Sequence, residues 1–276
     1  MTGPVSFKAA CVQLRSTGDV AQNIRDTSAL VREAAGQGAR FIATPENTNI
    51  MAQDNRAKLA ATFDEPNDPS LPAFSALAKD LKIWLLIGSL HIKVSDTRTA
   101  NRSFLLAPDG TVQARYDKIH LFDVTVAQGE SYRESSQVEG GQTCVLADTE
   151  LGPVGMTICY DLRFPQLYRR LAQAGAFAFT IPSSFTVPTG QAHWHVLMRA
   201  RAIENGAFVI APAQGGLHDN GRKTYGHSMI VGPWGDVLAE AGSDPGVIVA
   251  EIDPALSAAA SAKVPSLQHD RDFTGP

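Results

Sequence analysis

Hydrophobic positions along the chain follow two spacings. Short runs that are apolar at every or every second position are typical of strands, and apolar positions three or four apart are typical of helices. In the first half this pattern predicts, in order, strand 7–14, helix 19–35, strand 40–44, helix 72–81 and strand 83–90. Asp19 is placed to cap the first helix, whose apolar stripe is predicted at Val20, Ile24, Val31 and Ala35.

The next segment predicts a β-hairpin. Apolar runs over 101–107 and 111–117 are separated by Pro-Asp-Gly, a strong turn signal. The second half repeats the rhythm of the first, with strand 153–159, helix 166–175, strand 176–182, helix 192–206 and strand 207–213. Strands over 227–232 and 236–241 flank a Pro-Trp-Gly turn, and strand 246–252 closes the set.

Strands in both hairpin and βαβ order favour two sheets with helices outside, because a purely parallel sheet would not need the hairpins. The pattern alone therefore predicts an α/β or α+β fold. No low-complexity linker occurs before Asp253, so residues 1–252 are predicted to form one domain. The Ala/Ser-rich segment 253–276 is weakly patterned and is predicted to be a tail that packs at a subunit interface.

Composition narrows the class of protein. The net charge of the 276 residues is -4 and no long basic run exists, which argues against a nucleic-acid partner. No apolar run approaches the roughly 18 residues of a membrane span, and the first residues do not resemble a signal peptide. The three cysteines are few and odd in number, which favours free thiols and the cytoplasm over a disulfide framework.

Three polar residues each lie at or just beyond the end of a predicted strand. Glu46 follows "FIATP", Lys118 follows "ARYD", and Cys159 ends "GMTIC". Strand ends are where α/β proteins commonly place their sites. A charged group beside apolar strands is costly to bury unless it is paired. Bringing the three residues together would satisfy the charges and create a reactive group.

The residue types suggest nucleophilic chemistry. A free thiol has a pKa of about 8.5, so a nearby lysine would stabilise the thiolate and a carboxylate could accept the proton. Lys118 and the backbone N–H of Tyr160 could donate to an oxyanion, each such donor contributing roughly 3–4 kcal/mol. Taken singly, Cys159 could instead be packing, Glu46 a turn residue and Lys118 a solvated lysine. Cys11 and Cys144 are predicted to be packing.

The segments "RFIATPENTN", "RYDKIHLFD" and "GMTICYDLRF" resemble the three catalytic signatures of the nitrilase superfamily of carbon–nitrogen hydrolases, and the resemblance covers about residues 7–252. It implies a four-layer αββα sandwich, a homodimer or larger homo-oligomer, and no metal or organic cofactor. It also implies Glu46 as general base, Lys118 as oxyanion stabiliser and Cys159 as nucleophile. Glu134, in "SYRES", would be a second glutamate that positions Lys118 and the amine or water of the reaction; the alternative is an exposed loop residue.

The implied reaction is amide hydrolysis through a thioester on Cys159, with an acid and ammonia as products. "PSSFTVPTG", "AHWHVLMRARAIEN" and "YGHSMIVGPWG" are similar to the Nit subgroup, which implies deaminated glutathione or a related 2-oxo acid ω-amide as substrate and a role in metabolite repair. Arg163 is a candidate clamp for a substrate carboxylate, or else forms a structural salt bridge with Asp161 or another acid. Phe185 and Thr189 would line the pocket, or serve as loop packing.

The His193-Trp194-His195 segment resembles a metal pair, but positions two apart on a helix face different directions, so no metal is predicted. The subgroup usually has Glu where this chain has His195, which leaves its fine specificity open. His227, like Tyr225, is predicted to be structural.

Other functions stay open at this stage. An N-carbamoyl amino acid hydrolase or an aliphatic amidase would use the same three residues, and a true nitrilase is disfavoured by the subgroup motifs. A scaffold protein without turnover is a third possibility. The intact Glu46, Lys118 and Cys159 argue against it, because a silent descendant is expected to have lost at least one of them.

Overall fold

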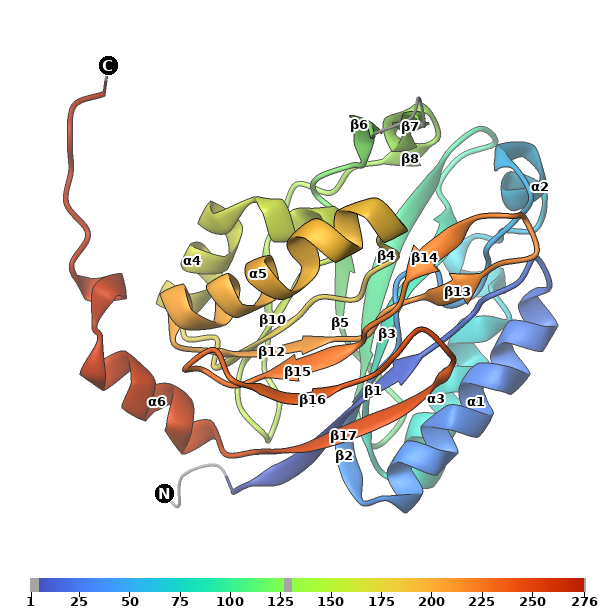
Figure 1. Cartoon of the computed structure of the whole chain (residues 1–276). Helices are drawn as coiled ribbons and strands as arrows, with labels where there is room; N and C mark the ends of the chain where they lie inside the picture. The colour runs from blue at the N-terminus through green and yellow to red at the C-terminus, as the bar shows by residue number, and fades with distance from the viewer. Residues whose placement is uncertain (1–4, 127–130, 276) are drawn as a thin grey trace.

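The computed structural model describes residues 5–126 and 131–275 of the chain. Two sheets pack face to face, and helices cover the outer face of each, as Figure 1 shows. The chain therefore forms the four-layer αββα sandwich that the resemblance implied. Among the described residues, no helix is both long enough and apolar enough to cross a membrane.

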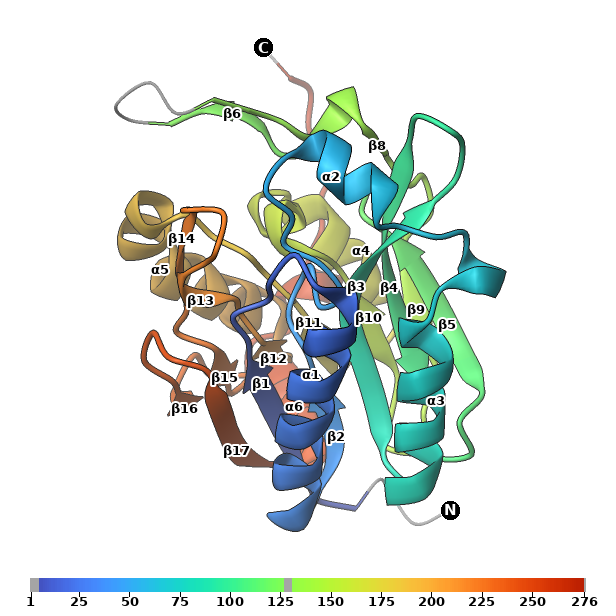
Figure 2. The ribbon, with the colours of Figure 1, turned by 90° about the vertical axis from the view of Figure 1, so that its right-hand side faces the viewer.

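The first sheet contains the hairpin and the amino-terminal strands. Its strand order is β17-β1-β2-β3-β4-β5, with short β8 (Val138–Glu139) beside β4. Figure 2 shows helices α1 and α3 side by side on its outer face. The bounds are β1 (Phe7–Gln13), α1 (Val20–Gly36), β2 (Ala39–Ala43), α3 (Ser70–Leu81), β3 (Trp84–Lys93), β4 (Thr99–Leu106), β5 (Val112–Asp117) and β17 (Gly246–Ile252).

The second sheet has the order β16-β15-β12-β11-β10-β9, and helices α4 and α5 cover it. Its bounds are β9 (Val145–Ala147), β10 (Val154–Met156), α4 (Pro165–Gln173), β11 (Ala178–Thr180), α5 (Val187–Asn205), β12 (Phe208–Ala211), β15 (Met229–Val231) and β16 (Val237–Glu240). Smaller elements are α2 (Asn55–Ala60), β6 (Asp123–Thr125), β7 (Ser131–Arg133), β13 (Gly215–Leu217), β14 (Lys223–Tyr225) and α6 (Pro254–Lys263).

Strand β1 explains why the layers form. Successive side chains of a strand point to opposite faces of the sheet. Ala9 and Cys11 belong to the core between the two sheets, whereas Ala10 and Val12 belong to the core beneath α1 and α3. Both faces of the strand are therefore buried, which is why its sequence is a nearly continuous apolar run.

The predicted elements are confirmed in type and order, but helix α1 differs in its buried face. The most buried positions are Asn23, Thr27, Val31 and Ala34, while the predicted stripe residue Ile24 is only partly buried. Hydrogen bonds rather than apolar contacts stabilise the buried Asn23, because its side-chain amide donates to the backbone oxygens of Thr17 and Asn49. Both of these bonds are 2.9 Å long.

Several element boundaries differ from the prediction; helix α5, for example, begins at Val187 rather than Ala192. The strand expected to reach Cys159 ends at Met156, because the chain turns into a 3-10 helix, η4 (Cys159–Arg163). The weakly patterned tail contains α6, which forms from alanine-rich sequence of high helix propensity and is capped by the Asp253 side chain. The tail packs on its own chain, where Asp270 pairs with Arg169 of α4. The interface expected for it stays a prediction.

Candidate active site

Three separate strands deliver the predicted polar residues to one place. Glu46 lies three residues beyond β2, Lys118 directly follows β5, and Cys159 begins η4 just after β10. All three side chains line a cavity of about 320 Å³. The sequence-based expectation that strand ends gather these residues is confirmed by the geometry.

Lys118 is the centre of a buried ionic cluster. Its Nζ lies 2.8 Å from Glu46 Oε1 and 2.8 Å from Glu134 Oε2. The Asn101 amide donates to both carboxylates, at 3.0 Å to Glu46 and 3.1 Å to Glu134, and the Phe122 N–H donates to Glu134 at 2.7 Å. Lys118 is therefore no surface lysine and Glu134 is no exposed loop residue.

The ionised state of this cluster is stabilised from within. Burial lowers the pKa of Lys118, but Glu134 and Glu46 together raise that pKa well above the usual lysine value. For Glu134, burial raises the pKa, but the charge of Lys118 and the hydrogen bonds from Lys118, Phe122 and Asn101 oppose burial and leave the pKa below its usual value. A lysine fixed between two carboxylates is thus held charged at neutral pH.

The thiol of Cys159 lies beside this cluster. Burial is the largest influence on its pKa and raises it, and the Glu46 carboxylate raises it further by its charge and by hydrogen bonding. Lys118 acts in the opposite direction, as does the Ser184 backbone N–H. The net effect is a raised pKa, so the resting thiol is protonated and its proton faces a carboxylate.

The backbone at Cys159 has an uncommon conformation. Its φ is 49°, in the left-handed region that non-glycine residues seldom adopt. Its own N–H donates to Pro182 O at 2.9 Å, and the Asp161 N–H donates to Ile158 O at 3.0 Å. Within the described chain, no acceptor occupies the Tyr160 N–H between them. This N–H is the free donor that an oxyanion beside the thiol would need.

Asp161 holds the turn in this conformation. Its buried carboxylate accepts the Tyr116 hydroxyl at 2.6 Å, the His120 Nδ1 at 2.7 Å and the Ile158 N–H at 2.9 Å. The alternative in which Asp161 pairs with Arg163 is therefore wrong. Sequence reasoning missed this positioning role, because Tyr116 and His120 lie more than forty positions away and no local pattern links them to Asp161.

The three predicted substrate-binding residues line the same cavity. The Arg163 guanidinium lies over the rings of Tyr160 and Phe185, at 5.9 and 5.6 Å from their centroids, and its Nη2 is 3.2 Å from His193 Nδ1. Thr189 shares a 2.8 Å hydrogen bond with the Thr186 hydroxyl. Arg163 is thus oriented by aromatic rings, and its guanidinium is available to bind an anion in the cavity.

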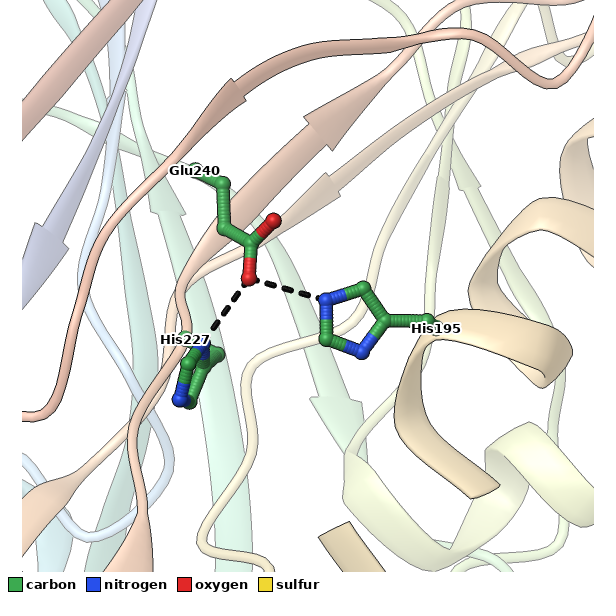
Figure 3. Close-up of side chains that lie close together, drawn as sticks. All are labelled: His195, His227 and Glu240. Carbon is green, nitrogen blue, oxygen red and sulfur yellow. Dashed lines mark hydrogen bonds and ion pairs between the residues drawn. The ribbon is translucent and has the colours of Figure 1, made fainter. Parts of the chain in front are cut away.

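His195 lies away from the cavity. Its Nε2 is 2.8 Å from Glu240 Oε1, and His227 Nδ1 is 2.8 Å from the same oxygen, as Figure 3 shows. His193 and His195 therefore have different partners, as expected for positions two apart on a helix. Within the described residues, this His195–His227–Glu240 surface cluster is the group close enough to hold a metal ion. In this cluster, Glu240 Oε1 is already the hydrogen-bond partner of both imidazole rings.

Comparison with known proteins gives consistent findings. Residues 8–262 match the family model described as carbon–nitrogen hydrolase. A deaminated glutathione amidase of Synechocystis sp. is 39% identical over 267 residues, which cover 95% of this chain and 97% of the relative. The C. elegans NitFhit crystal structure has a TM-score of 0.91 at 32% identity, covering 98% of this chain and 66% of that one. Yeast Nit3, described as a member of branch 10 of the nitrilase superfamily, has a TM-score of 0.85 at 29% identity over 94% of each chain.

Proposed function

The chain belongs to the carbon–nitrogen hydrolase family, and we propose that its cavity hydrolyses the amide of deaminated glutathione through a thioester on Cys159. It is a hydrolase of carbon–nitrogen bonds other than peptide bonds. One observation carries the mechanism: the Cys159 thiol lies beside Glu46, whose carboxylate is 2.8 Å from the buried Lys118. Nucleophile, base and oxyanion donor are thereby gathered in one cavity.

In the first half-reaction, Glu46 takes the thiol proton as the sulfur of Cys159 attacks the amide carbon. The raised pKa of the thiol means that proton transfer accompanies attack rather than preceding it. Lys118 Nζ and the Tyr160 N–H donate to the oxyanion. Glu46 then returns the proton to the amine, which leaves, and a thioester remains on Cys159.

In the second half-reaction, water attacks the thioester. Glu46 accepts a proton from the water, and the thiol regains a proton as the acid leaves. Glu134 keeps Lys118 in place throughout by its 2.8 Å contact. The proton moved in the first half-reaction comes from the Cys159 thiol and the one in the second comes from the water, and Glu46 carries each to its acceptor.

The leaving amine depends on the substrate. A primary ω-amide such as 2-oxoglutaramate releases ammonia. Deaminated glutathione carries its dipeptide on the same amide, so its hydrolysis releases cysteinylglycine and 2-oxoglutarate. An assay that follows 2-oxoglutarate detects both reactions, whereas an ammonia assay detects only the first.

Names of relatives support the choice of substrate. The relatives from Synechocystis sp. and Homo sapiens, each 39% identical over 95% of this chain, are named deaminated glutathione amidase. Arg163 agrees with a 2-oxo acid substrate, because its charge is held at the cavity wall beside Tyr160 and Phe185. A guanidinium in this position suits a carboxylate.

The test is kcat/KM on a panel: deaminated glutathione, 2-oxoglutaramate, an N-carbamoyl amino acid, an aliphatic amide and a nitrile. We expect deaminated glutathione to give the highest value. A higher value for the N-carbamoyl amino acid or the aliphatic amide would refute the substrate assignment and leave the Cys159 mechanism standing. Arg163→Ala should raise KM for carboxylate substrates far more than for the aliphatic amide; equal effects would remove the clamp.

We also propose a homodimer or larger homo-oligomer in a reducing compartment, the cytoplasm. Val196 and Ile203, seven positions apart on α5 and therefore on one face of it, are 67% and 53% exposed, and Leu256 of α6 is 53% exposed; burial of these apolar side chains against a second copy would support the assembly. The described cysteines are all free. Light scattering on wild type and Val196→Asp checks the assembly: the wild type should exceed the 29.5 kDa mass of one chain, and the variant should be smaller than the wild type. A monomeric wild type would exclude the proposal.

A further inference from the structure

Besides Lys118, Arg133 and Arg163, two further cations line the same cavity, Lys58 and Arg222. Lys58 projects from the short helix α2, and Arg222 lies just before β14. In both ribbon views, α2 and the β6–β7 hairpin lie at one end of the molecule (Figures 1 and 2). Sequence reasoning missed both residues, because neither belongs to a motif.

Neither cation has an acidic partner. Among residues 5–126 and 131–275, no carboxylate forms an ion pair with Lys58 or Arg222. The nearby carboxylates of Glu46 and Glu134 are already bound to Lys118. Two positive charges therefore face one cavity without an anion of their own, an arrangement that is unfavourable unless a ligand supplies one.

The pKa of Lys58 reflects electrostatic repulsion from the neighbouring cations. Its pKa is lowered, first by burial, and Arg222 and Lys118 lower it further although Glu134 and Glu46 oppose them. Lys58 and Arg222 are thus close enough to repel one another. An anion bound between them would reverse this effect.

Arg222 is positioned and incompletely satisfied. Its Nη2 donates to Ser184 O at 2.7 Å, and its guanidinium lies 5.5 Å from the centroid of the Tyr132 ring. Its Nε is buried and has no hydrogen-bond partner among the described residues. A buried unsatisfied donor on a cation is costly, and it suits an oxygen of a bound anion.

The two segments that carry these cations are tied together. Asn220 Nδ2 donates to Ala52 O at 2.9 Å, which joins the turn before β14 to the loop that leads into α2. Asn220 Oδ1 also accepts the Arg222 N–H at 3.0 Å. The loop that leads to Lys58 and the turn that carries Arg222 are therefore joined directly by a hydrogen bond.

We propose that Lys58 and Arg222 form a second anion subsite, which binds the carboxylate on the amine side of the scissile amide. This inference rests on the proposed function. Deaminated glutathione has two carboxylates, one on the 2-oxo acid and one on its terminal glycine. Arg163 binds the first and the Lys58–Arg222 subsite binds the second. A small ω-amide lacks the second carboxylate and leaves this subsite empty, so the subsite selects the longer substrate.

The experiment pairs variants with matched substrates. Lys58→Gln and Arg222→Gln are assayed on deaminated glutathione and on its derivative whose terminal glycine carboxylate is an uncharged amide. On the acid we expect each variant to lose roughly 10- to 100-fold in kcat/KM, since each removes a charge-assisted hydrogen bond. The wild type should lose a similar factor on the amide derivative, and the variants should then lose little more.

Controls separate this effect from general damage. Arg56→Gln on the same helix and Lys223→Gln beside Arg222 do not line the cavity and should match wild type on both substrates. Arg163→Gln should lose on both substrates equally. Thermal melts check folding, and Lys58→Gln, on a short and mostly exposed helix, carries the test if Arg222→Gln does not fold.

The outcomes are distinct. Equal losses by the variants on the acid and its amide derivative would overturn the subsite, as would no loss on either. If the wild type hydrolyses deaminated glutathione but the variants give either of these results, the proposed function stands and only the second subsite is refuted. A wild type that does not hydrolyse deaminated glutathione would refute both.

Discussion

Two of the clusters of paired polar side chains among the described residues have nearly the same contact lengths and opposite surroundings. In the cavity, Lys118 lies 2.8 Å from one oxygen of Glu46 and one of Glu134. On the surface, Glu240 lies 2.8 Å from His195 and His227. The side chain of Lys118 is 2% exposed, whereas those of Glu240 and His195 are 32% and 38% exposed.

The contact distances therefore do not indicate how much each cluster contributes to the free energy of unfolding. Water screens the surface cluster, where a pair of this kind contributes roughly 0–1 kcal/mol. In the buried cluster, every charge has been taken out of water and depends on its partners. The same dependence makes the buried cluster reactive, because its charges act on the neighbouring thiol with little screening. Burial, more than contact length, separates the two sites.

The largest effect should come from the thiol served by the buried cluster. Cys159→Ala should reduce kcat roughly 10⁴-fold or more, because no other group can form the thioester. Its melting temperature should stay close to that of wild type. Cys11→Ala, which changes a cysteine in the core outside the cavity, is the control and should keep its kcat. Wild-type turnover by Cys159→Ala would sink the mechanism.

A change in the buried cluster itself should cost stability. Lys118→Met leaves Glu46 and Glu134 buried without a cation, and such breakage costs about 3–5 kcal/mol in the free energy of unfolding. His195→Gln breaks the surface cluster and should cost less than about 1 kcal/mol. Urea unfolding of both variants measures the difference. Similar losses would mean that burial does not separate the clusters.

Acid should weaken the buried cluster more than the surface one. The pKa of Glu134 in the folded state lies below its usual value of 4.5, so its contribution is present above that value and is lost as pH falls below it. Unfolding free energy measured between pH 6 and 3 should fall with a slope that Glu134→Gln reduces. The slope of Glu240→Gln should stay nearer that of wild type, and the reverse ranking would contradict the comparison.

The smallest effect is expected for Glu240→Gln. Its carboxylate pKa is also lowered, because the hydrogen bonds of His227 and His195 outweigh the opposing effect of partial burial, but water screens these contacts. We expect a change within about 1 kcal/mol in unfolding free energy, reduced further by 1 M salt, and an unchanged kcat/KM. A loss of activity above tenfold would connect this surface cluster to the reaction.

The pattern of apolar residues predicted most of the fold, because strands buried on both faces and helices with one buried face leave local signals. Local sequence patterns did not predict features that depend on contacts between residues distant in the sequence. Asn23 is buried through hydrogen bonds to Thr17 and Asn49, which no hydrophobicity pattern contains. Helix α6 escaped prediction because an Ala/Ser-rich segment has no polar–apolar contrast.

The same division holds for the site. Glu46, Lys118 and Cys159 stand in local motifs and could be found from them. Asn101 could not, because its role comes from contacts to Glu46 and Glu134, which lie 55 and 33 positions away along the chain. Groups that act by touching two distant partners become visible only once the sheets have assembled.

The pairing of β1 with β17 has a consequence for how the protein forms. Phe7 lies opposite Ile252 and Gln13 opposite Gly246, so the earliest strand is paired along its whole length with the last strand of the chain. Bringing such distant segments together costs loop-closure entropy before the contacts reward it, which slows folding. During synthesis, β1 cannot pair with β17 until the chain has been made as far as Ile252. Refolding is accordingly expected to end with the docking of β17.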